Sequence, residues 1–241
     1  MKKILFCLAS LYAITVSAEF NFMLESGAVW QHRNDVKIPG NTGTRVNFDE
    51  FNQGPFFHYR GELYWKITDN HNLRAVYAPL NIAVKGRLPG NALFDGVSFS
   101  TSEELEVNYK FNSYRLTYFY SYWQSGKSFL NLGVTGKIRD AEIEFKQPSQ
   151  KASYDNVGFV PLLFVEYQAP IGSDWLFHTN IDAAAAPQGR AIDLTVKFRR
   201  PFMEKYKLGF GLRSLEGGAD NDKVFTFSWL NYAILDISGE F

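Results

Sequence analysis

Charged side chains recur at alternate positions along several segments of this sequence. Arg60, Glu62 and Lys66 share one parity of residues 57–67, opposite apolar and aromatic side chains. Parity assigns one face to a larger set of both signs: Glu25, Arg60, Glu62, Lys66, Arg115, Lys137, Arg139, Asp193, Lys197, Arg199, Arg213 and Asp236. His58, Arg74, Glu166, His178, Asp182 and Glu240 join the same face. We predict that this set lines one enclosed interior.

Two kinds of chemistry suit such an interior. A ring of Arg and Lys could select anions in a pore. The two signs are similar in number, however, and a narrow interior filled by side chains would bring them together as ion pairs. Because an unpaired buried charge costs several kcal/mol, we favour an ion-paired lumen with a structural or narrow-channel role.

Catalysis has weaker support in the sequence. His178 and Asp182 have the same parity, but positions i and i+4 on a strand lie about 13 Å apart, too far for a direct hydrogen bond. His32 would point outward near the outer leaflet, where barrel enzymes that deacylate lipid A keep a Ser and a His. An outer-leaflet lipid-modifying hydrolase is therefore the alternative function. We name no catalytic residue, metal ligand or cofactor.

Period-two alternation indicates that β-strands carry these residues. Aromatic residues make up 17% of the sequence, and Trp65, Tyr122, Trp123 and Trp175 stand at strand ends, as in an interfacial belt. We predict an all-β antiparallel transmembrane barrel; a periplasmic β-sandwich is the alternative. Ten strands are expected, with eight or twelve also compatible, at 20–34, 55–67, 72–85, 106–123, 128–144, 156–169, 174–186, 190–200, 206–215 and 223–241.

The connections alternate in length along the chain. Short polar links are expected at 68–71, 124–127, 170–174 and 201–205, and longer ones at 37–53, 86–102 and 146–153, with shorter outer links near 187–190 and 215–222. Short periplasmic turns and longer outer loops are typical of outer-membrane barrels. Pro79 and Pro161 fall inside expected strands, where we predict bulges or breaks.

The first 18 residues have the pattern of a secretory signal peptide: Lys2 and Lys3, an apolar run, and Val-Ser-Ala before the cut. Cleavage after Ala18 would leave residues 19–241 as one barrel domain. The whole chain has 25 basic and 25 acidic residues, so the loss of Lys2 and Lys3 gives a net charge of −2. That balance does not indicate a nucleic-acid partner. The single cysteine, Cys7, lies within the signal sequence.

The final segment, LDISGEF, resembles the C-terminal strand of bacterial outer-membrane barrel proteins. In that class the strand ends in Phe with apolar residues at every second position before it, here Phe241, Ile237 and Leu235. The resemblance implies an outer-membrane location and recognition by the barrel-assembly machinery. The stretches 109–118 and 212–222 resemble small uncharacterised members of the class. The ten-stranded omptin proteases are a natural comparison, but this chain has no comparable Asp-x-His pair.

The first outer connection, residues 31–55, is the longest irregular stretch. It mixes charged residues with Val36, Ile38, Val46, Phe48 and Phe51, so we expect it to fold inward or pack on neighbouring loops. Its Arg and Lys side chains near the rim could bind phosphates of lipopolysaccharide. Outer-membrane lipid and lipopolysaccharide are therefore expected partners. A structured cap is the simpler interpretation of the loop.

Overall fold

The computed structural model describes residues 19–187 and 189–241. The segment assigned above to a signal peptide, residues 1–18, lies outside the described residues. No helix in the described part of the chain has the length and apolar character needed to cross a membrane.

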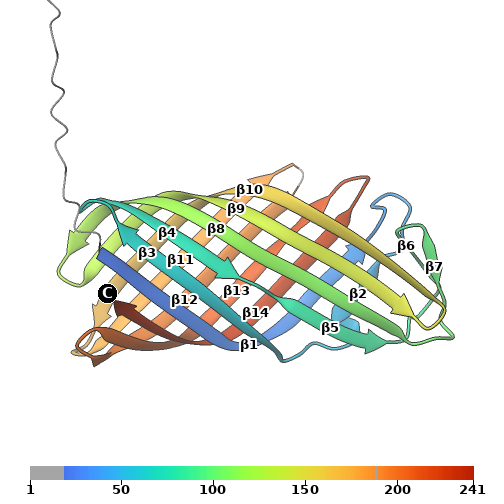
Figure 1. The fold of residues 1–241 in the computed structure, drawn as a ribbon, viewed down its shortest axis with the longest axis horizontal. Helices are drawn as coiled ribbons and strands as arrows, with labels where there is room; N and C mark the ends of the chain where they lie inside the picture. Colours follow the sequence, from blue (N-terminus) through green and yellow to red (C-terminus); the bar gives the residue numbers. More distant parts are fainter. Residues whose placement is uncertain (1–18, 188) are drawn as a thin grey trace, which may run out of the picture.

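A closed antiparallel barrel of ten strands forms the molecule, which confirms the predicted fold (Figure 1). It begins with β1 (Glu19–Lys37), which pairs with β14 (Phe225–Glu240) and so closes the sheet. The other barrel strands are β3 (Phe56–Lys66), β4 (His71–Ala78) with β5 (Asn81–Gly86), β8 (Leu105–Ser125), β9 (Ser128–Gln147), β10 (Gln150–Ile171), β11 (Trp175–Ala186), β12 (Gly189–Met203) and β13 (Tyr206–Asp220). Closure leaves no free sheet edge along the paired part of the wall, as a bilayer requires.

The two prolines mark different irregularities. Pro79 separates β4 from β5, and both pieces pair with β8, so together they form one barrel strand with the break that the sequence predicts. Pro161 lies within an unbroken β10 whose register with β9 continues without a shift, so the bulge or break predicted there was wrong. Pairing between β10 and β11 extends only as far as Leu163, two residues away. Since proline has no amide hydrogen to donate, Pro161 is tolerated in the part of β10 that no longer pairs with β11.

The links differ from the expected pattern at one outer connection. A long link was predicted at 146–153, but β9 runs to Gln147 and β10 starts at Gln150, so a two-residue turn joins them. The prediction was wrong because Ile143, Phe145 and Ala152 continue the inward apolar series of the two strands above the membrane. Polar residues on their outward face resembled a loop in the sequence.

The two long outer connections contain short elements of their own. The first, after β1, contains β2 (Val46–Asn47) and a single 3₁₀ turn, η1 (Phe48–Glu50). The second, after β5, contains the hairpin β6 (Ala92–Phe94) and β7 (Val97–Phe99). Both lie at the end of the barrel opposite the C-terminus (Figure 1).

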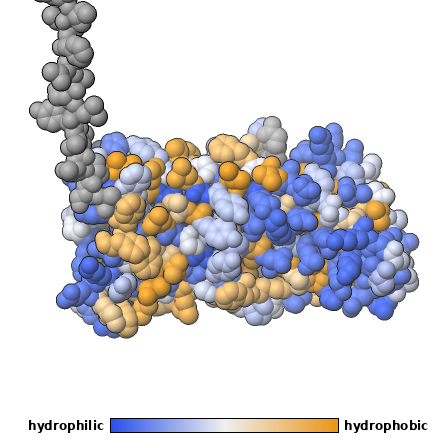
Figure 2. Space-filling view, viewed as in Figure 1, coloured by the Kyte–Doolittle hydropathy of each residue, from blue (hydrophilic) through white to orange (hydrophobic). Residues whose placement is uncertain are grey.

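An apolar outer belt surrounds the part of the barrel nearer the C-terminus, where orange side chains gather in Figure 2. Large apolar side chains are exposed there, and such exposure is favourable against lipid and unfavourable against water. They are Leu24, Leu63, Leu116, Val134, Leu163, Leu194, Leu212 and Leu235. Rings stand toward its two ends, among them Trp65, Tyr122, Trp123 and Trp175 at one end and Trp30 and Trp229 at the other.

Beyond the belt, β8, β9 and β10 continue as a hydrophilic extension (Figures 1 and 2). Its outward face carries exposed ion pairs such as Lys85 with Glu106 and Lys110 with Asp140. Hydrogen bonds from these lysines hold the pKa of the Glu106 and Asp140 carboxyls below their ordinary values. This extension therefore stands in water above the bilayer.

Candidate functional site: the barrel lumen

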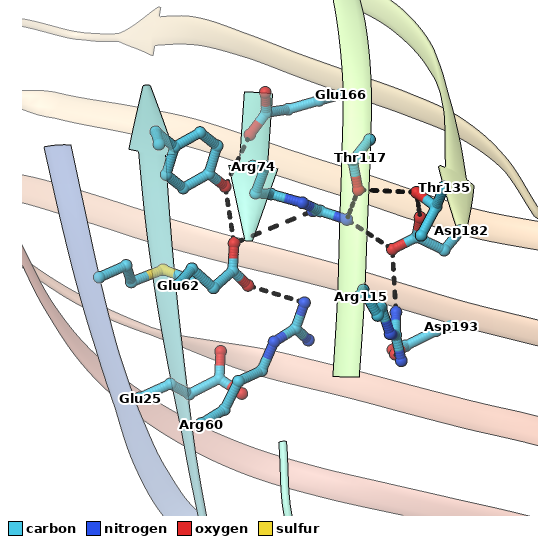
Figure 3. Close-up of polar contacts among 12 residues, drawn as sticks. Glu25, Arg60, Glu62, Arg74, Arg115, Thr117, Thr135, Glu166, Asp182 and Asp193 are labelled. Carbon is cyan, nitrogen blue, oxygen red and sulfur yellow. Dashed lines mark hydrogen bonds and ion pairs between the residues drawn. The ribbon is translucent and has the colours of Figure 1, made fainter. Parts of the chain in front are cut away.

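The middle of the lumen holds a buried ion-pair network that spans the barrel (Figure 3). Asp182 of β11 accepts hydrogen bonds from Arg74 Nη2 at 2.7 Å, from Arg115 Nη1 at 2.9 Å and from Thr135 Oγ1 at 2.6 Å. Arg115 comes from β8 and also donates to Asp193 of β12. All of these side chains are buried. The network thus joins walls that are far apart in the sequence.

A second part of the network lies toward β1 and the last three strands. Arg213 donates through both Nε and Nη2 to Asp193, at 2.7 and 2.8 Å. Lys197 donates to Glu25 at 2.5 Å and lies 3.7 Å from Asp236 Oδ2. This fork between Arg213 and Asp193 is the bidentate geometry in which guanidinium and carboxylate bind most strongly.

The remaining buried cations complete the layer. Arg199 donates to Asp236 Oδ1 at 3.1 Å, and Arg60 forms an ion pair with Glu62 at 2.7 Å. Tyr64 also donates to Glu62, at 2.7 Å. Breaking one member of such a buried pair strands its partner and costs about 3–5 kcal/mol. These contacts therefore fix how the walls face one another and fill this level of the lumen.

Lys137 and Arg139, both from β9, differ from the other cations of the predicted set. Lys137 is buried and lies with Nζ 4.8 Å from the centre of the Phe111 ring. Arg139 is half-buried and donates to Asn156. Among the described residues, neither cation has a carboxylate oxygen within 4.0 Å.

Two predicted lumen residues lie outside the buried layer. Lys66 stands at the barrel end next to the chain terminus, half-exposed, between Glu19 and Asp69 at 3.4 and 3.3 Å. Glu240 is exposed at the same end, 3.9 Å from Lys207. Both border a cavity of about 330 Å³ that opens at this end of the barrel. Both residues lie near the ends of their strands. Parity predicts the face on which a residue lies but not its depth along the barrel.

The four histidines occupy separate environments. His71 is exposed, with Nδ1 2.6 Å from the Tyr118 hydroxyl. His178 Nε2 lies 2.9 Å from Glu166 Oε1 in the buried lumen and does not contact Asp182. His58 is buried, with its ring 4.8 Å from that of Tyr232. His32 lies on the outer surface, with its ring 4.5 Å from that of Trp229. It borders a surface groove of about 430 Å³ that also contains Arg33, Arg45 and Arg190 beside carboxylates.

The outer half of the lumen is mainly apolar, with a buried hydrogen-bonded chain formed by Gln31, Asn34, Ser228 and the Tyr109 hydroxyl. The first long loop places Ile38, Val46 and Phe48 inside, and the second adds Leu88, Phe94 and Phe99. They pack against inward side chains of the wall: Val29, Ile82, Val84, Leu105, Val107, Tyr109, Ile143, Phe145, Leu215, Leu230, Tyr232 and Ile234. The inward packing expected of the first loop is confirmed. We call these loop residues and their wall contacts the apolar plug.

The wall half of this plug was not predicted from the sequence. Leu230, Tyr232 and Ile234 have the inward parity of Asp236, but only charged residues of that parity were assigned to the lumen. The available signal was a change along one face of β14, from Asp236 at one end to three large apolar residues. An inward face that turns apolar predicts that something apolar fills the lumen there.

The closing strand presents its predicted assembly residues to the outside. Phe241 is 77% exposed, with its ring centre 5.2 Å from that of Phe22. Leu235 is 68% exposed within the belt, and Ile237 is half-exposed beside it. The backbone amide of Phe241 donates to the Phe20 carbonyl at 2.9 Å. The last residue is thus anchored at the seam where the barrel closes.

Metal-binding geometry is not found in the described chain: no group of three or more His, Cys, Asp or Glu residues is placed to hold an ion.

Comparisons with known proteins identify the architecture. No protein-family model matches the sequence, and no curated protein matches it significantly. Among solved structures, the outer-membrane protease OmpT from Escherichia coli superposes with a TM-score of 0.61 at 8% identity, covering 94% of this chain and 98% of OmpT. Ail, the attachment invasion locus protein of Yersinia pestis, gives 0.42 at 9% identity, covering 92% and 99%. The transport unit of the autotransporter AIDA-I from Escherichia coli gives 0.43 at 7%, covering 97% and 93%.

The likeness to OmpT, at 8% identity, shows the fold and not the role. The chain has the architecture of a bacterial outer-membrane β-barrel. Its exposed apolar belt requires a lipid bilayer around it, and the outer membrane is where barrels of this architecture reside.

Proposed function

We propose that this chain is a non-enzymatic outer-membrane barrel that does not conduct and serves as a closed structural support for the surface beyond the membrane. Outer-membrane lipid and lipopolysaccharide would surround the barrel, and the barrel-assembly machinery would be its partner during insertion. One observation carries it: the apolar plug lies directly above the ion-paired layer in the same lumen.

The two levels close the lumen in different ways. In the ionic layer, long side chains from opposite walls meet across the axis, as Arg115 of β8 does with Asp182 of β11. In the plug, Phe48 is fully buried and its ring lies 5.9 and 6.2 Å from those of Phe145 and Tyr109. An ion that crossed would have to break buried pairs and then enter an apolar core, and both steps are costly.

The alternative of an outer-leaflet hydrolase finds little support around His32. A hydrolase of the expected kind needs a nucleophile within hydrogen-bond reach of its base. The described residues lining the groove at His32 include no serine, threonine or cysteine. Two of the three carboxylates there are bound by arginines: Asp35 by Arg33 at 2.6 Å and Glu216 by Arg190 at 2.5 Å. The third, Asp49, accepts a hydrogen bond from the Asn34 backbone amide at 2.9 Å. Lipid A from cells with and without the protein should show identical acyl patterns by mass spectrometry.

Single-channel recording in planar bilayers tests the closed lumen. The wild-type barrel should give no discrete conductance steps. A variant in which residues 39–53 are replaced by a short Gly-Ser linker loses Phe48 and opens the outer half, while the ionic layer remains. When Arg115→Ser and Asp182→Ser are added to this loop replacement, two charges of the ionic layer are removed as well, and discrete conductance steps should appear. Steps from the wild-type protein, at a frequency that follows its concentration, would refute the proposal.

A further inference from the structure

Two lumen cations lack the partner that every other buried lumen cation has. Arg60, Arg74, Arg115, Lys197, Arg199 and Arg213 each have a carboxylate oxygen within 4.0 Å. Lys137 and Arg139 have none among the described residues. The nearby Asp193 is already bound by Arg115 and Arg213. Arg139 Nε is buried without a hydrogen-bond acceptor.

An apolar cavity of about 50 Å³ is lined by Arg139 but not by Lys137. Arg139 and Asn156 line it on one side, and Phe111, whose ring faces Lys137, lines it as well. The rest of the lining is mainly apolar: Tyr109, Ala141, Ile143, Tyr154, Ala219 and Val224, with Glu142 and Thr226. Arg139 therefore lines the apolar cavity directly, and Lys137 contacts the Phe111 ring that forms part of its wall.

The barrel wall is open next to this cavity. The last pair between β10 and β11 is Leu163 with Ala183, and from Gln150 to Leu162 β10 pairs only with β9. β11 and β12 turn back at Ala186 and Gly189, whereas β8, β9 and β10 run on (Figure 1). The cavity lining therefore passes from β10 directly to the β13–β14 hairpin, with no residue of β11 or β12. We call this gap the lateral notch.

The lower part of the lateral notch faces lipid. Phe159 lies on the outward face of β10 alongside the gap and is 70% exposed, opposite Ile138 of β9, which is 49% exposed. An unpaired strand edge at this depth is costly in hydrocarbon, because its amides and carbonyls find no water there. A molecule with both polar and apolar parts would suit the gap better than a lipid tail alone.

We propose that the lateral notch admits an anionic amphiphile, whose carboxylate or phosphate head binds Arg139, with Lys137 as a second positive charge beside Phe111, while its chain lies against the apolar lining. The head supplies the missing negative charge. The cavity accommodates the head and the first carbons, and the remainder of the chain extends through the notch into the outer leaflet. This goes beyond the proposed closed lumen, because entry is sideways and needs no path through the plug.

Binding of a fluorescent polyene fatty acid to the barrel in phosphatidylcholine nanodiscs tests the proposal. The wild-type protein should bind the probe saturably. Decanoate or decyl phosphate should displace it, and decyltrimethylammonium should not, because only the anions satisfy the two cations. The relative potency of decanoate and decyl phosphate then distinguishes a fatty acid from a phospholipid-like ligand. Absence of saturable binding, or equal displacement by the ammonium amphiphile, would overturn the proposal.

Variants locate the site. Lys137→Met and Arg139→Gln should each weaken binding by roughly ten- to a hundredfold, the loss expected when one charged hydrogen-bond donor is removed. Val224→Glu should weaken it similarly by supplying a resident carboxylate near Arg139. Lys146→Gln is the matched control, since Lys146 is an exposed cation on the outward face of the same strand. Wild-type affinity in Lys137→Met and Arg139→Gln, with heat-modifiable gel migration intact, would refute the assignment.

Discussion

Asp182 is the residue on which the ionic layer depends most, so Asp182→Asn is the most informative perturbation. The change keeps the shape of the side chain and removes its charge. It leaves two buried guanidiniums, on Arg74 and Arg115, without the carboxylate that they share at 2.7 and 2.9 Å. Arg115 keeps Asp193, but Arg74 keeps only Glu62, at 3.9 Å.

The expected cost follows from that imbalance. Removing one partner of a buried ion pair costs about 3–5 kcal/mol. Because Arg115 retains a partner, we expect a loss of about 3 kcal/mol in the free energy of unfolding. That corresponds to roughly a hundredfold rise in the unfolding equilibrium constant.

Equilibrium unfolding in urea, followed by tryptophan fluorescence of the barrel in lipid vesicles, measures the loss. Asp140→Asn is the matched control: the same chemical change in an ion pair with Lys110 that lies outside the membrane and is partly exposed. The control should unfold close to wild type, since exposed pairs contribute little. If Asp182→Asn unfolds at the same urea concentration as Asp140→Asn, the ionic layer does not hold the lumen together.

Three further outcomes are expected. Phe48→Ala should destabilise the barrel by about 3–5 kcal/mol in the same unfolding assay, because it empties a fully buried site in the plug. Phe241→Ser should lower the heat-modifiable, folded fraction in outer membranes, whereas Phe202→Ser, at another exposed ring, should not. The carboxyl of Asp140 should titrate below its ordinary pKa, a shift that Lys110→Met abolishes in carboxyl NMR spectra. Because this pKa is depressed in the folded state, the associated stability is present above the unfolded pKa and is lost as pH falls through the folded one.

Strand period explains why much of the fold could be predicted. Successive side chains on a strand point to opposite faces, so the parity of Arg60 or Lys197 fixes its face once the strand is recognised. Bilayer thickness and aromatic belts then constrain strand length and number. Extension of β9 and β10 was missed, because outside the bilayer nothing ties strand length to a fixed thickness.

Parity could not show which charges meet. Arg115 and Asp182 are 67 residues apart, and Arg115 and Asp193 are 78 apart. Their contact depends on barrel curvature and on the register of every strand between them. For the same reason Lys137 and Arg139 looked like the other cations in the sequence, although the structure leaves them without carboxylate partners among the described residues.

The sequence by itself determined that segments within residues 19–241 alternate as strands with one apolar face and one charged face, because local side-chain direction is a property of each strand. Tertiary structure decided which side chains fill the lumen. Phe48 reaches the axis only because its loop folds back between walls already made apolar by Tyr109, Phe145 and Leu230. The lateral notch also depends on tertiary structure. β11 and β12 turn back while β10 continues, and this difference in length leaves a gap only when the strands lie side by side.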